Sequence, residues 1–296
     1  MEAHMDQKLE TFLTLCKTMH YGRAAEKLNL SQPAVSKHIQ ALEVQYGVRL
    51  FNYSKRRLQK TCEGVLLEQY AISLRYNEEK FLYSLHEKPK TLLRIGATKS
   101  IGDYILFTEV RRFLEREGNE LEFLVDNTAS LLSQLDAGEL DFVILEGIFD
   151  KRRYDCFLLR TEPYIGICEK NHRFSGKSVS VEELFSERLI LREHGSGTRN
   201  ILERELAQNG YSVNAFSKRA CISSFKLIKE LVRRGDGISF LYEAVVKDDE
   251  RFGRFSCPPL TGEHEFNVVF LKNTGAGALA EKFLFREKAQ PEKSSF

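Results

Sequence analysis

Residues 23–43 read RAAEKLNLSQPAVSKHIQALE, and this stretch decides the fold of the front of the chain. Its first six residues predict a short helix, and Asn29–Ser31 predicts a turn. Ser31 stands where an N-cap belongs, and Pro33 follows in the first turn of a second helix, where proline is tolerated. Apolar residues then recur at i, i+4 and i+7, which predicts one buried face made of Val35, Ile39 and Leu42.

The flanking sequence extends this pattern in both directions. An earlier apolar stripe at helical spacing predicts a preceding helix through Leu9, Phe12, Leu13, Cys16 and Met19. Gly47 is expected to end the helix of residues 32–46. A basic hairpin-like segment follows, with Lys55, Arg56, Arg57 and Lys60. The predicted unit is therefore a helix-turn-helix beside a basic loop.

Burial of one helix face leaves polar side chains on the outer faces, where they are suited to base edges and phosphates in a major groove. The competing interpretation is a three-helix packing module with a solvated basic loop. The capped helix, the basic loop and the local charge favour DNA binding. The predicted DNA-binding residues are Arg23, Ser31, Gln32, Pro33, Ala34, Ser36, Lys37, His38, Gln40, Lys55, Arg56 and Arg57.

Charge supports a division of the chain into two parts. The 296 residues carry 44 Lys and Arg against 42 Asp and Glu, a net of +2. Residues 1–90 hold 9 Lys and 5 Arg against 10 acidic residues, a net of +4, so the remainder carries −2. A basic front end on a slightly acidic body indicates two separate tasks.

Between the two parts, the sequence predicts a long helix from about Glu63 to His86. Leu67, Ala71, Leu74, Phe81 and Leu85 repeat by fours and threes, a seam of the kind that two chains share. Residues 88–90 (Lys-Pro-Lys) are expected to end it and to mark a domain boundary.

After this boundary, predicted strands alternate with predicted helices, which is typical of a mostly parallel sheet covered by helices. One helix is expected to run from the first strand through Phe113, and another to begin at Ser130. The predicted strands are Leu92–Ala97, Leu121–Val125, Asp141–Glu146, Tyr164–Cys168, Leu189–Leu191, Gly237–Tyr242 and Phe266–Leu271.

Polar residues follow three of these strands, at Thr98–Ser100, Asp126–Thr128 and Arg192–Arg199. Open α/β sheets bind ligands at strand carboxyl ends, and helix starts offer unpaired N–H groups. Hydroxyls, backbone donors and the neighbouring cations Lys99 and Arg199 together suit a small anion. The alternative for Thr128 and Ser196 is simple helix capping.

The stretch at residues 23–43, together with Leu50-Phe51 and Thr61…Gly64, resembles the winged helix-turn-helix of the LysR-type transcriptional regulators. The resemblance extends through the linker helix, and the rest of the chain is similar to that family's effector domain. Tyr53 and Lys60 depart from the family's wing, which usually has a basic residue and a leucine there.

The resemblance implies a winged helix-turn-helix with a long linker helix, followed by a two-lobed α/β effector-binding domain of periplasmic-binding-protein type. The expected domains are 1–65 for DNA binding, 66–90 for the linker and dimerisation helix, and 91–296 for effector binding. Lobe one is expected at about 91–161 and 266–290, and lobe two at about 162–265. The implied effector site is Thr98, Lys99, Ser100, Ile101, Thr128, Ser196, Gly197, Thr198, Arg199, Cys221 and Ile222.

Other classes of function fit the sequence less well. No apolar run approaches the roughly 18 residues that a membrane helix needs, and the N-terminus does not resemble a secretory signal. Six scattered cysteines without a C-x-x-C pair predict reduced thiols in the cytoplasm. His172, His194 and His264 lack metal-ligand spacing and no G-x-S-x-G is present, so we expect neither an enzyme nor a cofactor.

The sequence therefore predicts a regulator whose partners are double-stranded DNA, a small anionic effector, RNA polymerase and further copies of the chain, as a dimer or a tetramer. Two alternatives stay open. One is a regulator that senses redox state through a cysteine, since the resembled family includes peroxide sensors. The other is a small-molecule-binding protein whose helical front end serves only for assembly.

Overall fold

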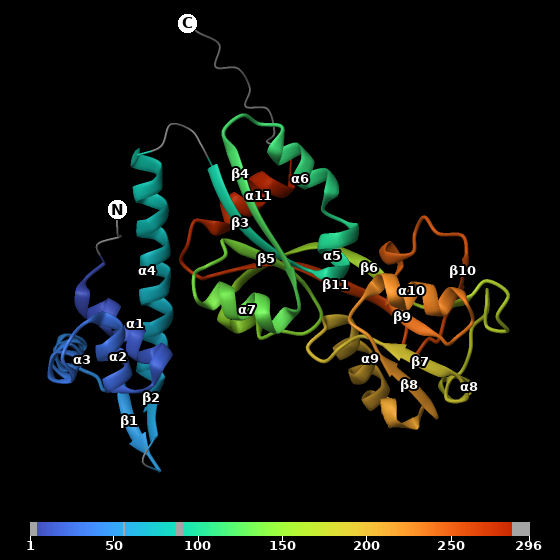
Figure 1. Cartoon of the computed structure of the whole chain (residues 1–296), viewed down its shortest axis with the longest axis horizontal. Helices are drawn as coiled ribbons and strands as arrows, with labels where there is room; N and C mark the ends of the chain where they lie inside the picture. The colour runs from blue at the N-terminus through green and yellow to red at the C-terminus, as the bar shows by residue number, and fades with distance from the viewer. Residues whose placement is uncertain (1–4, 56, 87–90, 286–296) are drawn as a thin grey trace, which may run out of the picture. The chain divides into compact units, whose positions relative to one another are not determined.

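The computed structural model describes residues 5–55, 57–86 and 91–285, which divide between two compact units (Figure 1). Unit 1 comprises residues 1–90 together with 136–139 and 271–275, and unit 2 comprises the rest. Arg56, residues 87–90 at the expected end of the linker, and residues 286–290 of the expected first lobe lie outside the described residues.

Unit 1 contains the predicted helix-turn-helix and wing. Ser31 caps α3 by accepting a hydrogen bond from the Ala34 amide at 3.3 Å, and Gly47 ends the helix in the left-handed conformation at φ 69°. Both predictions are confirmed. The elements are α1 (Gln7–Thr18), α2 (Tyr21–Leu28), α3 (Gln32–Tyr46), β1 (Phe51–Ser54), β2 (Arg57–Lys60) and α4 (Cys62–His86).

The core of unit 1 is built from the apolar stripes of its helices. Phe12, Val35, Ile39 and Leu42 are buried together, as predicted, while Met19 follows the end of α1 and packs only partly. The first part of α4 joins this core through Leu67 and Ala71.

The predicted seam along α4 is therefore not one continuous strip. Leu67 and Ala71 face the DNA-binding module, whereas Leu74, Phe81 and Leu85 are exposed, Phe81 to 60%. Leu66 and Tyr70 are also exposed, and the steps of four and seven between these positions put them on one helix face. The exposed apolar stripe consists of Leu66, Tyr70, Leu74, Phe81 and Leu85.

Unit 2 has a seven-stranded sheet and a second, two-stranded sheet made of β7 and β8. The predicted single helix before Phe113 is two helices, because the chain leaves the helical path at Ile105–Leu106. The elements are β3 (Thr91–Thr98), α5 (Lys99–Tyr104), α6 (Phe107–Leu114), β4 (Asn119–Asp126), α7 (Thr128–Asp136), β5 (Phe142–Glu146), β6 (Asp155–Glu169), α8 (Val181–Leu184), β7 (Arg188–Leu191), α9 (Gly197–Gln208), β8 (Lys218–Cys221), α10 (Phe225–Arg233), β9 (Ser239–Tyr242), β10 (Phe252–Phe255), β11 (Gly262–Phe270) and α11 (Ala276–Leu284).

The seven-stranded sheet runs β10-β6-β11-β5-β3-β4, with β9 paired to β6. Only β3–β4 and β3–β5 are parallel pairs, so the expectation of a mostly parallel sheet is wrong for this sheet. The reason is that β6 and β11 are long strands that run in opposite directions. Their shared register places Gly262 opposite Tyr164 and Phe266 opposite Arg160, where the two lobes were expected to connect.

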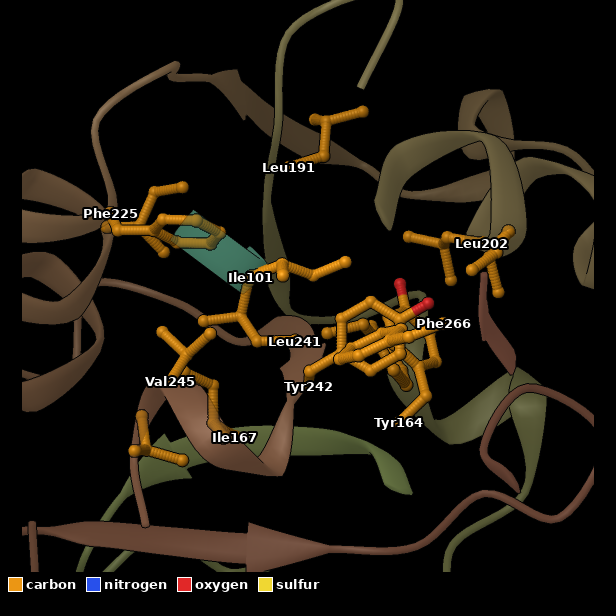
Figure 2. Packing of buried hydrophobic residues seen from close by; sticks show 14 of the residues in the cluster. Ile101, Tyr164, Ile167, Leu191, Leu202, Phe225, Leu241, Tyr242, Val245 and Phe266 are labelled. Carbon is orange, nitrogen blue, oxygen red and sulfur yellow. The ribbon is translucent and has the colours of Figure 1, made fainter. Parts of the chain in front are cut away.

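These two strands link two groups of elements within unit 2 (Figure 1). Elements β3–β5 with α5–α7 and α11 form the first group, here called lobe one, and β7–β10 with α8–α10 form lobe two. One buried apolar cluster runs through both lobes. Figure 2 shows Tyr164, Tyr242 and Phe266 packed together in it, and Tyr164 and Tyr242 have ring centroids 5.4 Å apart.

Candidate functional site

Helix α3 presents the residues that the sequence assigns to DNA. Gln32, Pro33, Lys37 and Gln40 are exposed, while Ala34, Ser36 and His38 are half-buried. Arg23 on α2 is also exposed, as are Lys55 and Arg57 around the β1–β2 turn. The structure thus leaves polar and basic side chains available on the outer side of the module.

Two of these residues have additional roles inside the module. The Ser31 hydroxyl accepts the capping hydrogen bond of α3, and Nδ1 of His38 lies 2.8 Å from the Thr11 hydroxyl on α1. Both interactions fix the position of α3 against its neighbours. Ser31 and His38 therefore orient this helix whether or not they also touch DNA.

The wing is held in place by residues that are not among the predicted DNA-binding residues. Glu43 at the end of α3 accepts hydrogen bonds from the Leu50 amide and from Arg49, both at 2.9 Å. The Thr61 hydroxyl donates to the Arg49 carbonyl at 2.6 Å. A Cβ at Gly64 would lie 2.2 Å from the carbonyl oxygen of Leu50, which directly precedes β1, so the close approach of α4 to this point of the chain requires glycine.

In unit 2, two of the three predicted junctions meet at a buried carboxyl. Ser100 comes from lobe one and Thr198 from lobe two, and their hydroxyls lie 3.4 Å apart. Both hydroxyls donate to Oε1 of Glu146, Thr198 at 2.8 Å and Ser100 at 3.2 Å. Glu146 ends β5 and is only 2% exposed. Strand ends that are far apart in the sequence therefore converge, as the expected fold requires.

The third junction, at Thr128, lies close to the loop that leads into Thr198 and α9. A Cβ at Gly195 would be 3.7 Å from Oδ1 of Asn127, so the loop that precedes α9 packs on the start of α7. Asn127 caps α7 by accepting from the Ser130 amide at 3.0 Å. The capping interpretation of Thr128 is therefore wrong, since its neighbour performs that role.

Several buried polar atoms at these strand ends have no hydrogen-bond partner in the described part of the chain. The hydroxyl of Ser196 makes no capping bond although it precedes α9, and the Thr98 hydroxyl makes none at α5. Unpaired buried polar atoms are rare in proteins because each costs free energy. The atoms are Thr98 Oγ1, Thr128 Oγ1, Glu146 Oε2, Arg192 Nη1, Ser196 Oγ and Tyr242 Oη.

The cations around the site differ in how fully they are paired. Lys99 forms an ion pair with Glu193 at 3.3 Å. Arg199 donates hydrogen bonds to Glu203 at 2.8 Å and to the Arg192 carbonyl at 3.1 Å. Arg192 is 3% exposed and pairs with Glu193 through two hydrogen bonds, while its Nη1 is one of the unpartnered atoms. Arg192 thus keeps a buried N–H group that pairs with none of the described residues.

The remaining predicted effector residues are Ile101, Gly197, Cys221 and Ile222. Ile101 is fully buried in the apolar cluster, and the Ile222 amide donates to the Leu191 carbonyl at 2.9 Å (Figure 2 shows Ile101 and Leu191). Cys221 is exposed, with its sulfur 3.5 Å from Nη1 of Arg199. Gly197 packs directly against Glu146, because a Cβ there would lie 2.7 Å from the Glu146 carbonyl oxygen.

The predicted effector residues do not include Glu146 and Tyr242, and Arg192 was predicted only as the first residue of the junction at 192–199. A signal for Glu146 was present, since it follows the apolar run Phe-Val-Ile-Leu at the end of a predicted strand. The rule that selected Thr98 and Asp126 at strand ends applies equally to it. Arg192 stands in the same position after β7, whereas Tyr242 carries no polar signal of this kind.

Burial determines the charge states near the site. Desolvation raises the pKa of the Glu146 carboxyl, although the Thr198 and Ser100 hydrogen bonds and the Arg192 charge oppose it. Burial also raises the pKa of the Tyr164 and Tyr242 phenols well above 10, so both hydroxyls keep their protons. Tyr164 donates its hydroxyl to the Thr198 carbonyl at 2.9 Å.

Two further kinds of feature are absent from the described residues. No group of three or more His, Cys, Asp or Glu side chains is arranged to hold a metal ion there. Within the same residues, none of the helices combines the length and the apolar character that crossing a membrane requires.

Comparison with known proteins identifies the family. Residues 7–65 match the model described as bacterial regulatory helix-turn-helix protein, lysR family, and residues 86–286 match the LysR substrate binding domain. The transcriptional regulator CysL of Bacillus subtilis is 30% identical over 248 residues, which is 81% of each chain. The RuBisCO operon transcriptional regulator of Allochromatium vinosum is 29% identical over 239 residues, covering 79% of this chain and 78% of that one.

Solved structures agree on the fold. A full-length OxyR variant from Pseudomonas aeruginosa superposes with a TM-score of 0.59 at 24% identity, over 96% of this chain and 94% of that chain. The two matched domains together span most of the sequence. With the exposed face of α3 and the two-lobed unit 2, these matches show that the chain belongs to the LysR-type family of DNA-binding transcriptional regulators and is not an enzyme.

Proposed function

We propose that this LysR-type regulator reads duplex DNA with α3 and its wing, and that a small anion bound between the lobes of unit 2 modulates that activity. The cluster of buried, unpartnered polar atoms at the converging strand ends is the observation that carries the second part. Effector binding would bias the arrangement of subunits, and so the spacing of their DNA-reading helices, by population shift.

The chemistry of the cluster favours an anion. Four of its six unpartnered atoms are hydroxyls, which can donate, and a fifth is the guanidinium nitrogen Nη1 of Arg192. The Arg192 side chain is stacked over the Phe225 ring at 4.1 Å, which holds its planar group in a fixed orientation. A bound anion would give these donors the acceptors that the described residues do not supply.

The exposed apolar stripe on α4 supports self-association. Five large apolar side chains on one face of a surface helix are a common mark of a shared interface. The working form in this proposal is a dimer or a tetramer that acts on DNA in the cytoplasm, with RNA polymerase as a further partner. In the same proposal, most base and phosphate contacts would come from the polar residues on the outer faces of α3, namely Gln32, Ser36, Lys37 and Gln40.

The buried thiols of Cys16, Cys168 and Cys257 give little support to a redox-sensing function. All six cysteines are free thiols. Burial raises the pKa of Cys168 to about 12 and that of Cys257 to about 11, and it also raises the pKa of Cys16. Thiols with raised pKa values react slowly because the thiolate is the nucleophile.

The DNA-reading role is tested on the full chain with a duplex selected from a random pool. Lys37→Ala should weaken binding to all duplexes and reduce the salt dependence, because a phosphate contact is lost. Gln32→Ala should cost about 1–3 kcal/mol on the selected duplex only, because a base contact is lost. Both are measured by fluorescence anisotropy at several salt concentrations.

Lys17→Ala is the matched control, since Lys17 is an exposed lysine on α1 outside the predicted interface. It should bind like the wild type. Unchanged affinity and unchanged sequence preference for both α3 variants would exclude this helix as the reader. Binding that does not depend on salt would instead favour the alternative in which the helical front end serves only for assembly.

A further inference from the structure

Glu146 is the one acidic side chain inside the cluster of unpartnered atoms in the described structure, and its two carboxyl oxygens differ. Oε1 accepts from the hydroxyls of Thr198 and Ser100. Oε2 is buried and has no hydrogen-bond partner among the described residues. An acid at a site otherwise rich in donors and suited to an anion requires an explanation.

The surroundings of Glu146 favour its neutral form. The charged group that acts on it is Arg192, from the end of β7, which already forms two hydrogen bonds with Glu193, at 2.8 and 2.9 Å. The titratable groups facing it from β6 and β9 are the phenols of Tyr164 and Tyr242, which are neutral. A fully buried carboxyl without an ion-pair partner of its own is stabilised when protonated.

The hydrogen bonds determine where that proton lies. Oε1 already accepts from two hydroxyls, so the neutral acid carries its proton on Oε2. The O–H group on Oε2 is then a donor. The unpartnered atoms of Thr98, Thr128, Ser196 and Arg192 can likewise donate hydrogen bonds.

We propose that Glu146 is an effector-binding residue which, as a neutral carboxylic acid, donates a hydrogen bond from Oε2 to a fully ionised oxyanion such as a carboxylate or sulfate. This assignment rests on the effector site proposed above and specifies its ligand class. An ionised Glu146 would repel the same ligand. The neutral acid therefore selects ligands that accept a hydrogen bond, and ligand binding is linked to the presence of the proton on Oε2.

The protonation state is tested first, without any ligand. Urea unfolding of the full chain is measured from pH 5 to 9 for the wild type, for the isosteric Glu146→Gln and for the control Glu122→Gln, which changes an exposed glutamate on β4. The unfolded carboxyl has its ordinary pKa of 4.5, and burial raises the folded value. Above pH 4.5 the folded state therefore holds a proton that the unfolded state has lost.

The sign of the expected effect follows from that difference. The folding equilibrium constant of the wild type, relative to Glu146→Gln, should fall by up to tenfold per pH unit above 4.5, and level off above the folded pKa. Glu122→Gln should show no such trend against the wild type. A ratio between the wild type and Glu146→Gln that stays constant from pH 5 to 9 would overturn the neutral assignment.

Ligand recognition is tested next with sodium sulfate and sodium acetate, against chloride at equal ionic strength. Thermal denaturation at pH 6 should show specific stabilisation of the wild type and of Glu146→Gln, whose amide NH₂ also donates. Glu146→Leu should bind at least tenfold more weakly. Because sulfate also stabilises proteins generally, the difference from Glu146→Leu isolates the contribution of the site.

The outcomes separate this assignment from the proposed function. Equal binding of an anion by the wild type and Glu146→Leu would overturn the role of Glu146 while leaving an anionic effector in place. A neutral Glu146 with no stabilisation of the wild type by either anion would overturn the anionic effector, and this assignment with it. Binding by the wild type that weakens as the pH rises, beside pH-independent binding by Glu146→Gln, would support both.

Discussion

Gly197→Ala tests how closely lobe two approaches lobe one at the start of α9. The added Cβ would lie 2.7 Å from the carbonyl oxygen of Glu146 and 2.8 Å from its Cγ. A side-chain terminus could move away from such a contact, but a backbone carbonyl in β5 is held by the sheet. Gly147, which follows β5, is equally close to α9, since a Cβ added to it would lie 3.1 Å from the Cα of Gly197.

The magnitude follows from two opposing terms. Overpacking a tightly packed site costs about 1–3 kcal/mol, whereas replacing glycine by alanine in a helix gains up to about 1 kcal/mol. The gain is smaller at the first residue of α9 than in a helix interior. We therefore expect a net loss of about 1–2 kcal/mol, which corresponds to a decrease in Tm of roughly 2–8 °C for a unit of this size.

Thermal and urea unfolding of the full chain measure this effect, and stabilisation by sulfate measures its consequence for the site. Gly262→Ala is the matched control, because nothing lies within 4 Å of a Cβ at that glycine. It should stay within about 0.5 kcal/mol of the wild type. A Gly197→Ala protein with the Tm of the wild type and undiminished sulfate stabilisation would refute the close approach of the lobes at this point.

Two further predictions concern the start of α7 and the stripe on α4. Asn127→Ala should cost about 0.5–2 kcal/mol of stability because it removes the cap of α7, whereas Thr128→Ala should cost little, since its hydroxyl has no partner, yet should weaken anion stabilisation. Urea unfolding separates the two, and the reverse order would contradict the assignment of the cap. Leu74→Glu and Phe81→Glu should dissociate the full-length oligomer in light scattering, while Val44→Glu, an exposed apolar position on α3, should not. Unchanged mass for both α4 variants would exclude this stripe as an interface.

The DNA-binding module was predictable almost residue by residue because its signals are local. A helix start, a stop and a buried face are each specified within a few neighbours, as Ser31, Gly47 and the series Val35, Ile39 and Leu42 show. The restriction to local signals also explains why the prediction of one continuous seam along α4 is wrong. Leu67 and Leu74 look alike in a periodic pattern, but only the packed structure shows that the first belongs to the core of unit 1.

The sheet of unit 2 was predictable as strands but not in its pairing. Strand directions depend on which segments meet across long separations in the chain, and the antiparallel pair β6–β11 joins residues about a hundred positions apart. No periodicity within a single strand specifies its neighbour. The two-lobed arrangement was expected only from the resemblance to the LysR-type family.

The sequence by itself determined which residue types stand at the strand ends, and with them that hydroxyls and backbone donors would be available for a ligand. Only the tertiary structure decided which of these groups remain unpaired. Arg199 is neutralised by Glu203 one helical turn away, whereas Nη1 of Arg192 and Oε2 of Glu146 are buried without a partner among the residues that the structure describes. The physical reason is that burial and hydrogen bonding depend on residues brought together by folding, so a side chain's charge state and its availability are properties of the packed site.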